Sequence, residues 1–508
     1  MRYLFKPLSY QSGTAMAVGA TFVWKIISFI NALLIAAFFG AGDATDIYFY
    51  LLIIMGIGVS FVQRVNASLV IPEAMSLDAQ TPQGGRGLLS LFLYVYGAFF
   101  VLLTLAGAFT PVWLGHLISR FSLAQLNAHR LLLVWGFGLF GLQLLYAYLV
   151  SVLEMYRRFA SSLFAPLNAI LPLLALLVLG KFCGIESMIY GFIASYSIQI
   201  VMFLWIMKKE LHWQFLYPPH WPKGRFTRNW WSLQVMEIIT LASSFLPMYL
   251  LSAFSAGIVS ALNYAKQLTD SATEVFSLRV SNISKIQLTE DLTHHNWNIA
   301  NNHFLANYHT LLFILTPLAV FSCFFAPQIV YIFFARGQFD QEAAWRVTAF
   351  LRPLLAVMWA VIPVFMLSNV TVAGRKVKES LPYGLFSSLL FIVFIFVAIR
   401  KGGPFAFPYV LLVYYAVSSI LTNIFLKRHF PQFALKRSWK MAARLLAINL
   451  GALVPCAIGY ALLPHTNAWL TVIFYGIIYV VSLGGICRVS GDLKYFLENT
   501  HLHALLRK

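Results

Sequence analysis

Charged residues are scarce in this chain. Asp, Glu, Lys and Arg make up 10% of its 508 residues, whereas apolar residues make up 60%. A soluble domain carries about 25% charged residues, so this chain has too little polar material to cover a water-facing surface. We therefore expect a membrane protein. The excess of 36 Lys+Arg over 17 Asp+Glu then indicates basic loops on one membrane face rather than a nucleic-acid partner.

The chain also lacks the patterns of common enzymes. It has no G-x-S-x-G, no P-loop, no H-E-x-x-H and no nucleotide-binding domain that would drive transport with ATP. Its four cysteines are scattered without a C-x-x-C pair, which is typical of buried thiols rather than disulfides or metal ligands. We expect a transporter without metal or organic cofactor.

Long apolar runs are abundant. A membrane-spanning helix needs about 20 mostly apolar residues, and continuous runs of this length favour helices over barrel strands. The sequence predicts an all-α polytopic protein with about fourteen spans, near 14–39, 46–72, 88–109, 131–153, 160–180, 187–207, 231–254, 257–282, 308–334, 344–370, 381–399, 405–426, 441–463 and 468–487.

The basic residues orient these spans. With the N-terminus in the cytoplasm, the cytoplasmic segments hold 24 Lys+Arg and the outer loops hold seven. Cytoplasmic loops of membrane proteins are enriched in Lys and Arg. This asymmetry predicts that both termini are cytoplasmic. The remaining five basic residues lie inside predicted spans, and they are Lys25, Arg64, Lys266, Arg279 and Arg352.

An internal repeat divides the chain. The turn from Phe39 to Tyr48 resembles the turn that starts at Phe254, and the offset of 215 also aligns Arg64 with Arg279. Both turns join spans of the same order, so we expect two parallel six-helix lobes. The predicted parts are an N-terminal lobe at 1–207, a basic cytoplasmic loop at 208–230, a C-terminal lobe at 231–430, and the last two spans with a cytoplasmic tail at 431–508.

Charges inside spans are costly and usually face a bundle interior or a wet cavity. Lys25 lies in the middle of the first span, where it can offer a cation to an anionic head group or pair structurally. Lys266, Asp270 and Glu274 recur every four residues and so share one helical stripe. The stripe is a candidate for ion coupling or substrate contact, or it lines a water-filled entrance.

Two further sets of charges complete the candidates. Arg64 and Arg279 can clamp a diphosphate or anchor helix ends at lipid head groups. Arg352, which we count among the substrate contacts, and Glu237 are single charges that can also pair between lobes. Cations between two lobes suit a phosphate-bearing amphiphile whose apolar part stays in lipid.

Two aspartates belong to a turn rich in small residues. Asp43 and Asp46 precede or begin the second span. Carboxylates are favoured at helix N-termini, where they accept hydrogen bonds from free backbone N–H groups. We expect both to cap the second helix rather than to contact substrate.

Several segments resemble the MurJ (MviN) family of lipid II flippases. The turn Phe39–Asp46 resembles the family's F-G-A-G-x-A-T-D turn, and Asn263–Asp270 resembles its Y-A-D-R-L-x-E stretch. Ala335–Asp340 resembles its R-G-x-F-D segment, and Gly374–Lys376 begins a loop similar to its G-D-x-x-T-P loop. The likeness covers most of the chain in order.

This resemblance implies a fold of the multidrug/oligosaccharidyl-lipid/polysaccharide exporter type. Two lobes would form a cavity, and the last two spans, 441–463 and 468–487, would form a groove for a polyprenyl tail. An undecaprenyl-diphosphate-linked saccharide would be flipped across the bacterial inner membrane by alternating access, driven by the membrane potential or a coupling ion (Na⁺ or H⁺). Partners would be membrane lipids and cell-wall or polysaccharide synthases. Lys25 falls where the family has an arginine, and Asp270 where it has a carboxylate.

The sequence departs from the family at other cavity positions. Asn31 and Ala32 replace an arginine and an aspartate, Gly58-Val59 falls where the family has an arginine pair, and Gln267 replaces an arginine. These changes leave open an alternative cargo, the lipid-linked unit of an O-antigen or capsule. A cation-coupled multidrug exporter is disfavoured by Lys25 and Lys266, and a membrane glycosyltransferase by the short outer loops.

Overall fold

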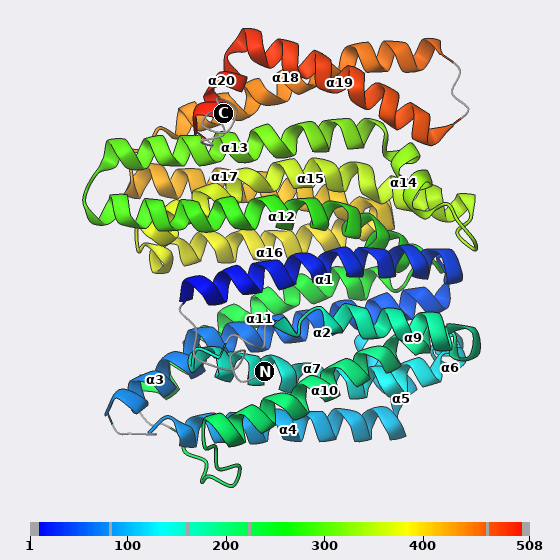
Figure 1. Cartoon of the computed structure of the whole chain (residues 1–508), viewed down its shortest axis with the longest axis vertical. Helices are drawn as coiled ribbons and strands as arrows, with labels where there is room; N and C mark the ends of the chain where they lie inside the picture. The colour runs from blue at the N-terminus through cyan, green and yellow to red at the C-terminus, as the bar shows by residue number, and fades with distance from the viewer. Residues whose placement is uncertain (1–9, 81–83, 159–162, 222–224, 464–466, 500–508) are drawn as a thin grey trace. The chain divides into compact units, whose positions relative to one another are not determined.

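The computed structural model describes residues 10–80, 84–158, 163–221, 225–463 and 467–499 (Figure 1). Every regular element in these ranges is a helix. Eleven helices are long and apolar enough to cross a membrane, and two shorter apolar helices accompany them. The predicted all-α polytopic class is therefore confirmed.

The chain folds into two compact units, Met1–Ser260 and Ala261–Lys508. The compact units divide at Ser260 and not within the basic loop 208–230. The predicted lobes are defined by a repeated set of six helices. A division into compact units does not test such a repeat, so the lobes stay a prediction.

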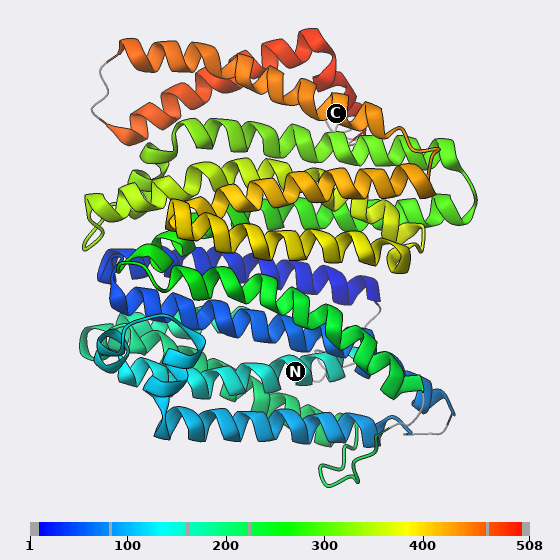
Figure 2. The same cartoon turned by 180° about the vertical axis from the view of Figure 1, so that it is seen from behind.

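The first unit is built around α7. This helix packs against α2, α4 and α10, α9 packs on both α10 and α1, and α11 packs on α2 (Figures 1 and 2). The helices are α1 (Tyr10–Phe39), α2 (Asp43–Val65), α3 (Ile71–Gln80), α4 (Arg86–Phe109), α5 (Pro111–Ile118), α6 (Leu123–Ala128), α7 (Arg130–Met155), α9 (Leu167–Cys183), α10 (Glu186–Glu210) and α11 (Arg225–Leu251).

A π-helical turn at Asn66–Val70 joins α2 to α3 without interrupting the helix. The three segments form one apolar stretch from Asp43 to Gln80. Buried side chains of this stretch, among them Val62 and Val70, pack with Tyr148 of α7 and Phe203 of α10 in the core of the first unit. The core therefore fixes α2, which carries Arg64, against the centre of the unit.

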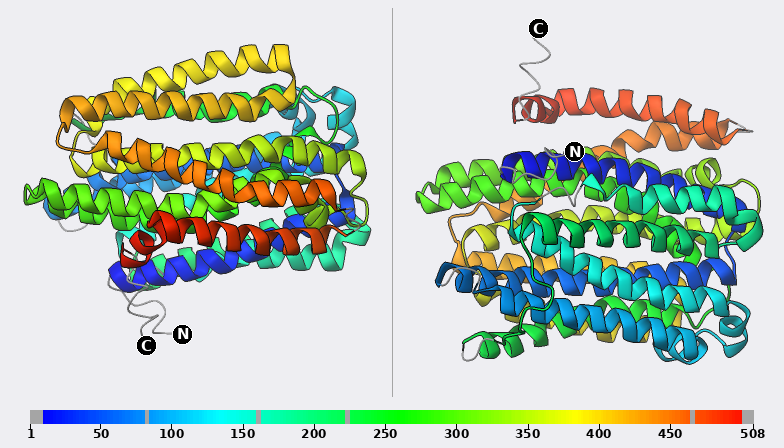
Figure 3. Two further views of the ribbon diagram at one scale, coloured as in Figure 1. Left: turned by 90° about the horizontal axis from the view of Figure 1, so that it is seen from above. Right: turned by 60° about the horizontal axis from the view of Figure 1, so that its bottom comes forward.

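The second unit has α15 at its centre. This helix packs against α13 and α17, α16 covers α17, and α18 pairs with α19 (Figures 1 and 3). The helices are α12 (Ile258–Thr293), whose first residues belong to the first unit, then α13 (Trp297–Phe324), α14 (Ala326–Phe334), α15 (Gln341–Ala373), α16 (Val377–Gly402), α17 (Phe407–His429), α18 (Leu435–Leu462), α19 (Ala468–Ser490) and α20 (Asp492–Asn499). A 3₁₀ turn at Pro404–Ala406 precedes α17.

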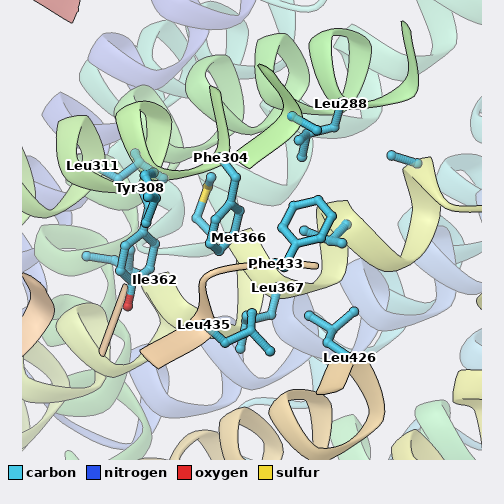
Figure 4. Close-up of a cluster of buried hydrophobic side chains, with 14 of the residues drawn as sticks. Leu288, Phe304, Tyr308, Leu311, Ile362, Met366, Leu367, Leu426, Phe433 and Leu435 are labelled. Atoms are coloured by element: carbon cyan, nitrogen blue, oxygen red, sulfur yellow. The ribbon is translucent and has the colours of Figure 1, made fainter. Parts of the chain in front are cut away.

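The core of this unit is apolar and aromatic. Figure 4 shows Phe304 and Tyr308 of α13 against Met366 of α15, with Phe433 beneath them and Leu288 of α12 beside them. All five side chains are buried. Burial at this density holds α13, α15 and the start of α18 together as one body.

The predicted count of fourteen spans is not confirmed, although each predicted span overlaps helical segments of the described chain. The apolar parts of α9 and α11 are short, at Leu167–Cys183 and Glu237–Leu251. Helix α12 is 36 residues long, but its charged stripe keeps it outside the apolar set in the part of the chain that the structure describes.

The predicted span 308–334 was wrong in its bounds. Helix α13 begins at Trp297 and ends at Phe324, and a separate helix, α14, starts at Ala326. Pro327 lies in the first turn of α14, where proline is tolerated because the N–H that it lacks would be unpaired there anyway. The apolar run continues across this break, so hydropathy alone does not reveal it.

Candidate functional site

Lys25 lies on α1 beside an aromatic ring. Its side chain is half-buried, and its Nζ is 5.0 Å from the centroid of the Trp24 ring. An ammonium group at this distance is attracted by the negative face of the ring. Phe22, Val23 and Ile26 around it are exposed. The Trp24 ring thus stabilises the Lys25 ammonium group on a stretch of α1 whose other side chains are mainly apolar.

Arg64 is paired with Glu237. The Arg64 Nε donates to Glu237 Oε2 at 2.6 Å, and the pair joins the last turn of α2 to α11. The Arg64 side chain remains 40% exposed. The printed bond engages Nε, and the exposed part of the guanidinium is a cation that an anion can approach. Glu237 thus pairs with a residue of the other predicted lobe, as the sequence analysis allowed, although the sequence did not identify Arg64 as that partner.

The stripe on α12 is partly described. Lys266 is half-buried, and Asp270 is exposed. The side chains of Glu274 and Arg279 lie outside the described residues, and the predicted clamp of Arg64 with Arg279 stays a prediction.

Arg352 lines a large cavity in the second unit. The cavity has a volume of about 840 Å³ and lies among α13, α14, α15, α17 and α18. Among its lining residues in the described chain, Arg352 is the one that carries a charge. The Cys323 thiol donates a hydrogen bond to the backbone carbonyl oxygen of Arg352, with an Sγ–O distance of 3.6 Å. Two polar side chains also line the cavity: Gln328 of α14 and Tyr460 near the C-terminal end of α18, which are hydrogen-bonded to each other. The rest of the lining is mainly apolar. An apolar pocket with a single cation suits an amphiphile with an anionic group.

The prediction that Asp43 and Asp46 cap the second helix was wrong. Gly42 occupies the N-cap of α2, and Asp43 Oδ1 accepts from Gln125 Nε2 at 2.7 Å. Asp46 is 2% exposed and accepts from the backbone N–H groups of Gly257 and Ser260 at 2.8 and 2.7 Å. It therefore caps the start of α12. The donors lie more than 200 residues away, so local spacing could not identify them.

The two repeated turns contact each other at this point. Ser260 Oγ donates its proton to Asp46 Oδ1 and lies within hydrogen-bonding distance of Thr45 Oγ1, at 2.9 Å. Thr45 and Ser260 are separated by 215 residues, the offset of the internal repeat. Equivalent positions of the two turns are thus in contact with each other, with Asp46 buried among them.

The family model for the lipid II flippase MurJ matches residues 35–480. The chain belongs to this family. Its function is transport, the flipping of lipid II, and not an enzymatic reaction. The predicted resemblance and the predicted transporter class are therefore confirmed.

Solved structures agree with the MurJ assignment at the level of the fold. A lipid II flippase MurJ in an inward closed conformation is 17% identical, with a TM-score of 0.76 over 94% of this chain and 99% of that chain. An inward-facing multidrug resistance MATE transporter of the MOP superfamily is 14% identical, with a TM-score of 0.55 over 86% and 96%. A MOP superfamily transporter from Pyrococcus furiosus is 12% identical, with a TM-score of 0.52 over 82% and 95%. No curated protein matches the sequence.

Asn31 stands where the MurJ resemblance expects an arginine on the first helix. Its side chain is 6% exposed, and its Nδ2 donates to the carbonyl of Ala169 on α9 at 3.0 Å. Beside it, Asn168 Oδ1 accepts from Ser195 Oγ at 2.8 Å and from Gln199 Nε2 at 2.7 Å. Asn31 therefore belongs to a buried polar seam between α1, α9 and α10. Sequence reasoning missed this seam because its members are neutral and isolated within apolar runs.

Proposed function

We propose that this chain flips a polyprenyl-diphosphate-linked saccharide, lipid II or a close relative, across the bacterial inner membrane by alternating access. The observation that carries the proposal is the match to the MurJ family model over residues 35–480. The long apolar helices and the fold shared with a solved MurJ structure support it. The basic segments between spans support cytoplasmic termini, because Lys and Arg are enriched on that side.

The cavity beside Arg352 suits the polyprenyl part of the cargo. Its volume of about 840 Å³ lies within the roughly 300–1,000 Å³ of ordinary ligand pockets. It would therefore hold part of a long chain while the rest stays in the bilayer. Its border with α18 agrees with the sequence-based expectation that the last two spans form a groove for the tail.

The intramembrane charges supply contacts for the diphosphate and for coupling. Lys25 and the exposed guanidinium of Arg64 are cations that phosphate oxygens can approach, Arg64 with bidentate geometry. Asp270 is the carboxylate that would bind the coupling ion, Na⁺ or H⁺, or respond to the membrane potential. Intramembrane carboxylates commonly have this role in transporters.

A second cargo, the lipid-linked unit of an O-antigen or capsule, is favoured by one observation. Asn31 is buried in packing with Ala169, so the first helix presents one cation fewer than the MurJ resemblance implies. A cavity with fewer cations would place less demand on the charge of the cargo.

Complementation tests the choice between these cargoes. The chain would be expressed in a bacterium depleted of its own lipid II flippase, beside Lys25→Ala and Asp270→Ala variants at equal membrane levels. We expect rescue by the natural sequence and loss of rescue in both variants. Failure of the well-expressed natural sequence to rescue would exclude lipid II as cargo, and the precursor that accumulates in the native host without this chain would then identify it.

A further inference from the structure

The last helix folds back onto the second unit. Gly491 has a φ of +82°, a left-handed conformation that glycine adopts without strain. The turn lets α20 (Asp492–Asn499) pack against α13 as well as α19. Aromatic contacts hold it there, because the Tyr495 ring meets His309 edge-on at 4.7 Å and the Phe496 ring stacks on Phe313 at 4.4 Å.

Asp492 is the point at which three helices meet. Its carboxylate is buried, and it accepts from Ser490 Oγ at 2.6 Å. Arg444 Nη2 of α18 lies 3.1 Å from Asp492 Oδ2 and also donates to the carbonyl of Ser490. His309 Nε2 of α13 lies 3.7 Å from Asp492 Oδ1. The carboxylate thus ties α18 to the chain that leaves α19, while His309 lies beside it without a hydrogen bond. We call Asp492, Arg444 and His309 the α20 anchor.

The helices joined by the α20 anchor also border the cavity. Directly after Arg444, Leu445 is buried in the core, whereas Leu446 and Leu450 of the same helix line the cavity. At the far end, Gln328 Nε2 donates to the Tyr460 hydroxyl at 2.5 Å. Besides its core side chains, α18 is therefore held by polar contacts at Arg444 and at Tyr460, and the segment between them lines the cavity.

We propose that the α20 anchor positions α18 over the cavity and thereby sets how readily an apolar chain enters it. This inference rests on the proposed function in one respect only: the proposed function identifies the apolar chain that enters the cavity as the polyprenyl part of the lipid cargo. Removing the charge of Asp492 would leave the Arg444 guanidinium, in the third turn of α18, without its ionic partner. Core side chains such as Leu435 and Leu445 would still hold the start of α18, but the segment that lines the cavity would lose one of its fixed points and would move away from α13 more often.

Cys323 is a built-in reporter of this opening, because it lines the cavity and is half-buried. The experiment measures the rate at which a hydrophobic maleimide alkylates Cys323 in nanodiscs, with the other three cysteines replaced. Asp492→Asn keeps the shape of the side chain, and Arg444→Gln removes the partner that is 54% exposed. We expect each to raise the rate about tenfold, the scale of losing one charged hydrogen bond.

Lys440→Gln is the matched control, because Lys440 is an exposed basic residue one turn earlier on α18, and its rate should equal that of the natural sequence. An unchanged rate in folded Arg444→Gln, or an equal rise in Lys440→Gln, would overturn the inference. If Asp492→Asn does not fold, the alkylation rate of the Arg444→Gln variant alone tests the inference.

A second measurement separates this inference from the proposed function. Undecaprenyl phosphate should slow the alkylation of Cys323 in the natural sequence. If it does not, the cargo assignment of the cavity fails, while the role of the anchor is still decided by the variants.

Discussion

A single buried carboxylate, Asp46, illustrates how much one residue contributes here. It accepts two backbone N–H groups and one hydroxyl at the start of α12. A helix N-terminus has unpaired N–H groups and a partial positive charge, so a carboxylate there is doubly favoured. The residue that sequence reasoning assigned to a local cap instead joins the two repeated turns.

Asp46→Ala should destabilise the protein because it leaves buried donors without an acceptor. We expect a loss of roughly 2–3 kcal/mol, since unpaired buried polar groups cost about 1–3 kcal/mol each and a lost cap about 1 kcal/mol. Asp43→Ala is the control, because Asp43 accepts one side-chain bond from Gln125 and should cost less than about 1 kcal/mol. Thermal unfolding of the two purified variants gives the comparison, and equal midpoints would contradict this role of Asp46.

Helix packing in the first unit depends on a close approach between α9 and α10. A Cβ added at Gly191 of α10 would lie 2.4 Å from the Cα of Pro172 on α9. Because backbone atoms cannot move as a flexible side chain does, the two helices would have to separate. Glycine therefore permits the contact that also brings Asn168 to Ser195 and Gln199.

Gly191→Ala should therefore destabilise the first unit by about 2 kcal/mol, within the range for overpacked interiors. Gly97→Ala on α4 is the matched control, because a Cβ there has no atom within 4 Å. We expect that control to be neutral or stabilised by up to about 1 kcal/mol, as alanine is the better helix former. Thermal unfolding measures both, and a Gly191 variant as stable as the Gly97 variant would show that the helices separate without cost.

Elements were more predictable from the sequence than the partners of single residues. Each apolar run overlaps helical segments because length and hydropathy dictate a membrane span directly. The break between α13 and α14 was missed, since the apolar run continues across it. The sequence allowed a pairing of Glu237 between lobes but did not identify Arg64 as its partner, and the anchor at Asp492 was missed altogether. Their partners lie far apart in the sequence, and only the packing of helices brings them together.

At the scale of the whole molecule, family membership and fold agree on a lipid II flippase, while the cargo contacts stay proposals. The family model covers residues 35–480, which include both repeated turns and the cavity beside Arg352 but begin after Lys25. The candidate cations were found from the sequence because charge within an apolar run is conspicuous. The neutral seam at Asn31 was not conspicuous in this way.

The most direct test of the account is a flipping assay with the purified chain in liposomes that contain fluorescent lipid II. A membrane-impermeant quencher added outside bleaches only lipid in the outer leaflet. We predict that the chain exposes inner-leaflet lipid II to the quencher, that Lys25→Ala slows this exposure, and that fluorescent phosphatidylcholine stays protected. Lipid II that remains as protected as in empty liposomes, or equal exposure of both lipids, would contradict the assignment of this chain as a lipid II flippase.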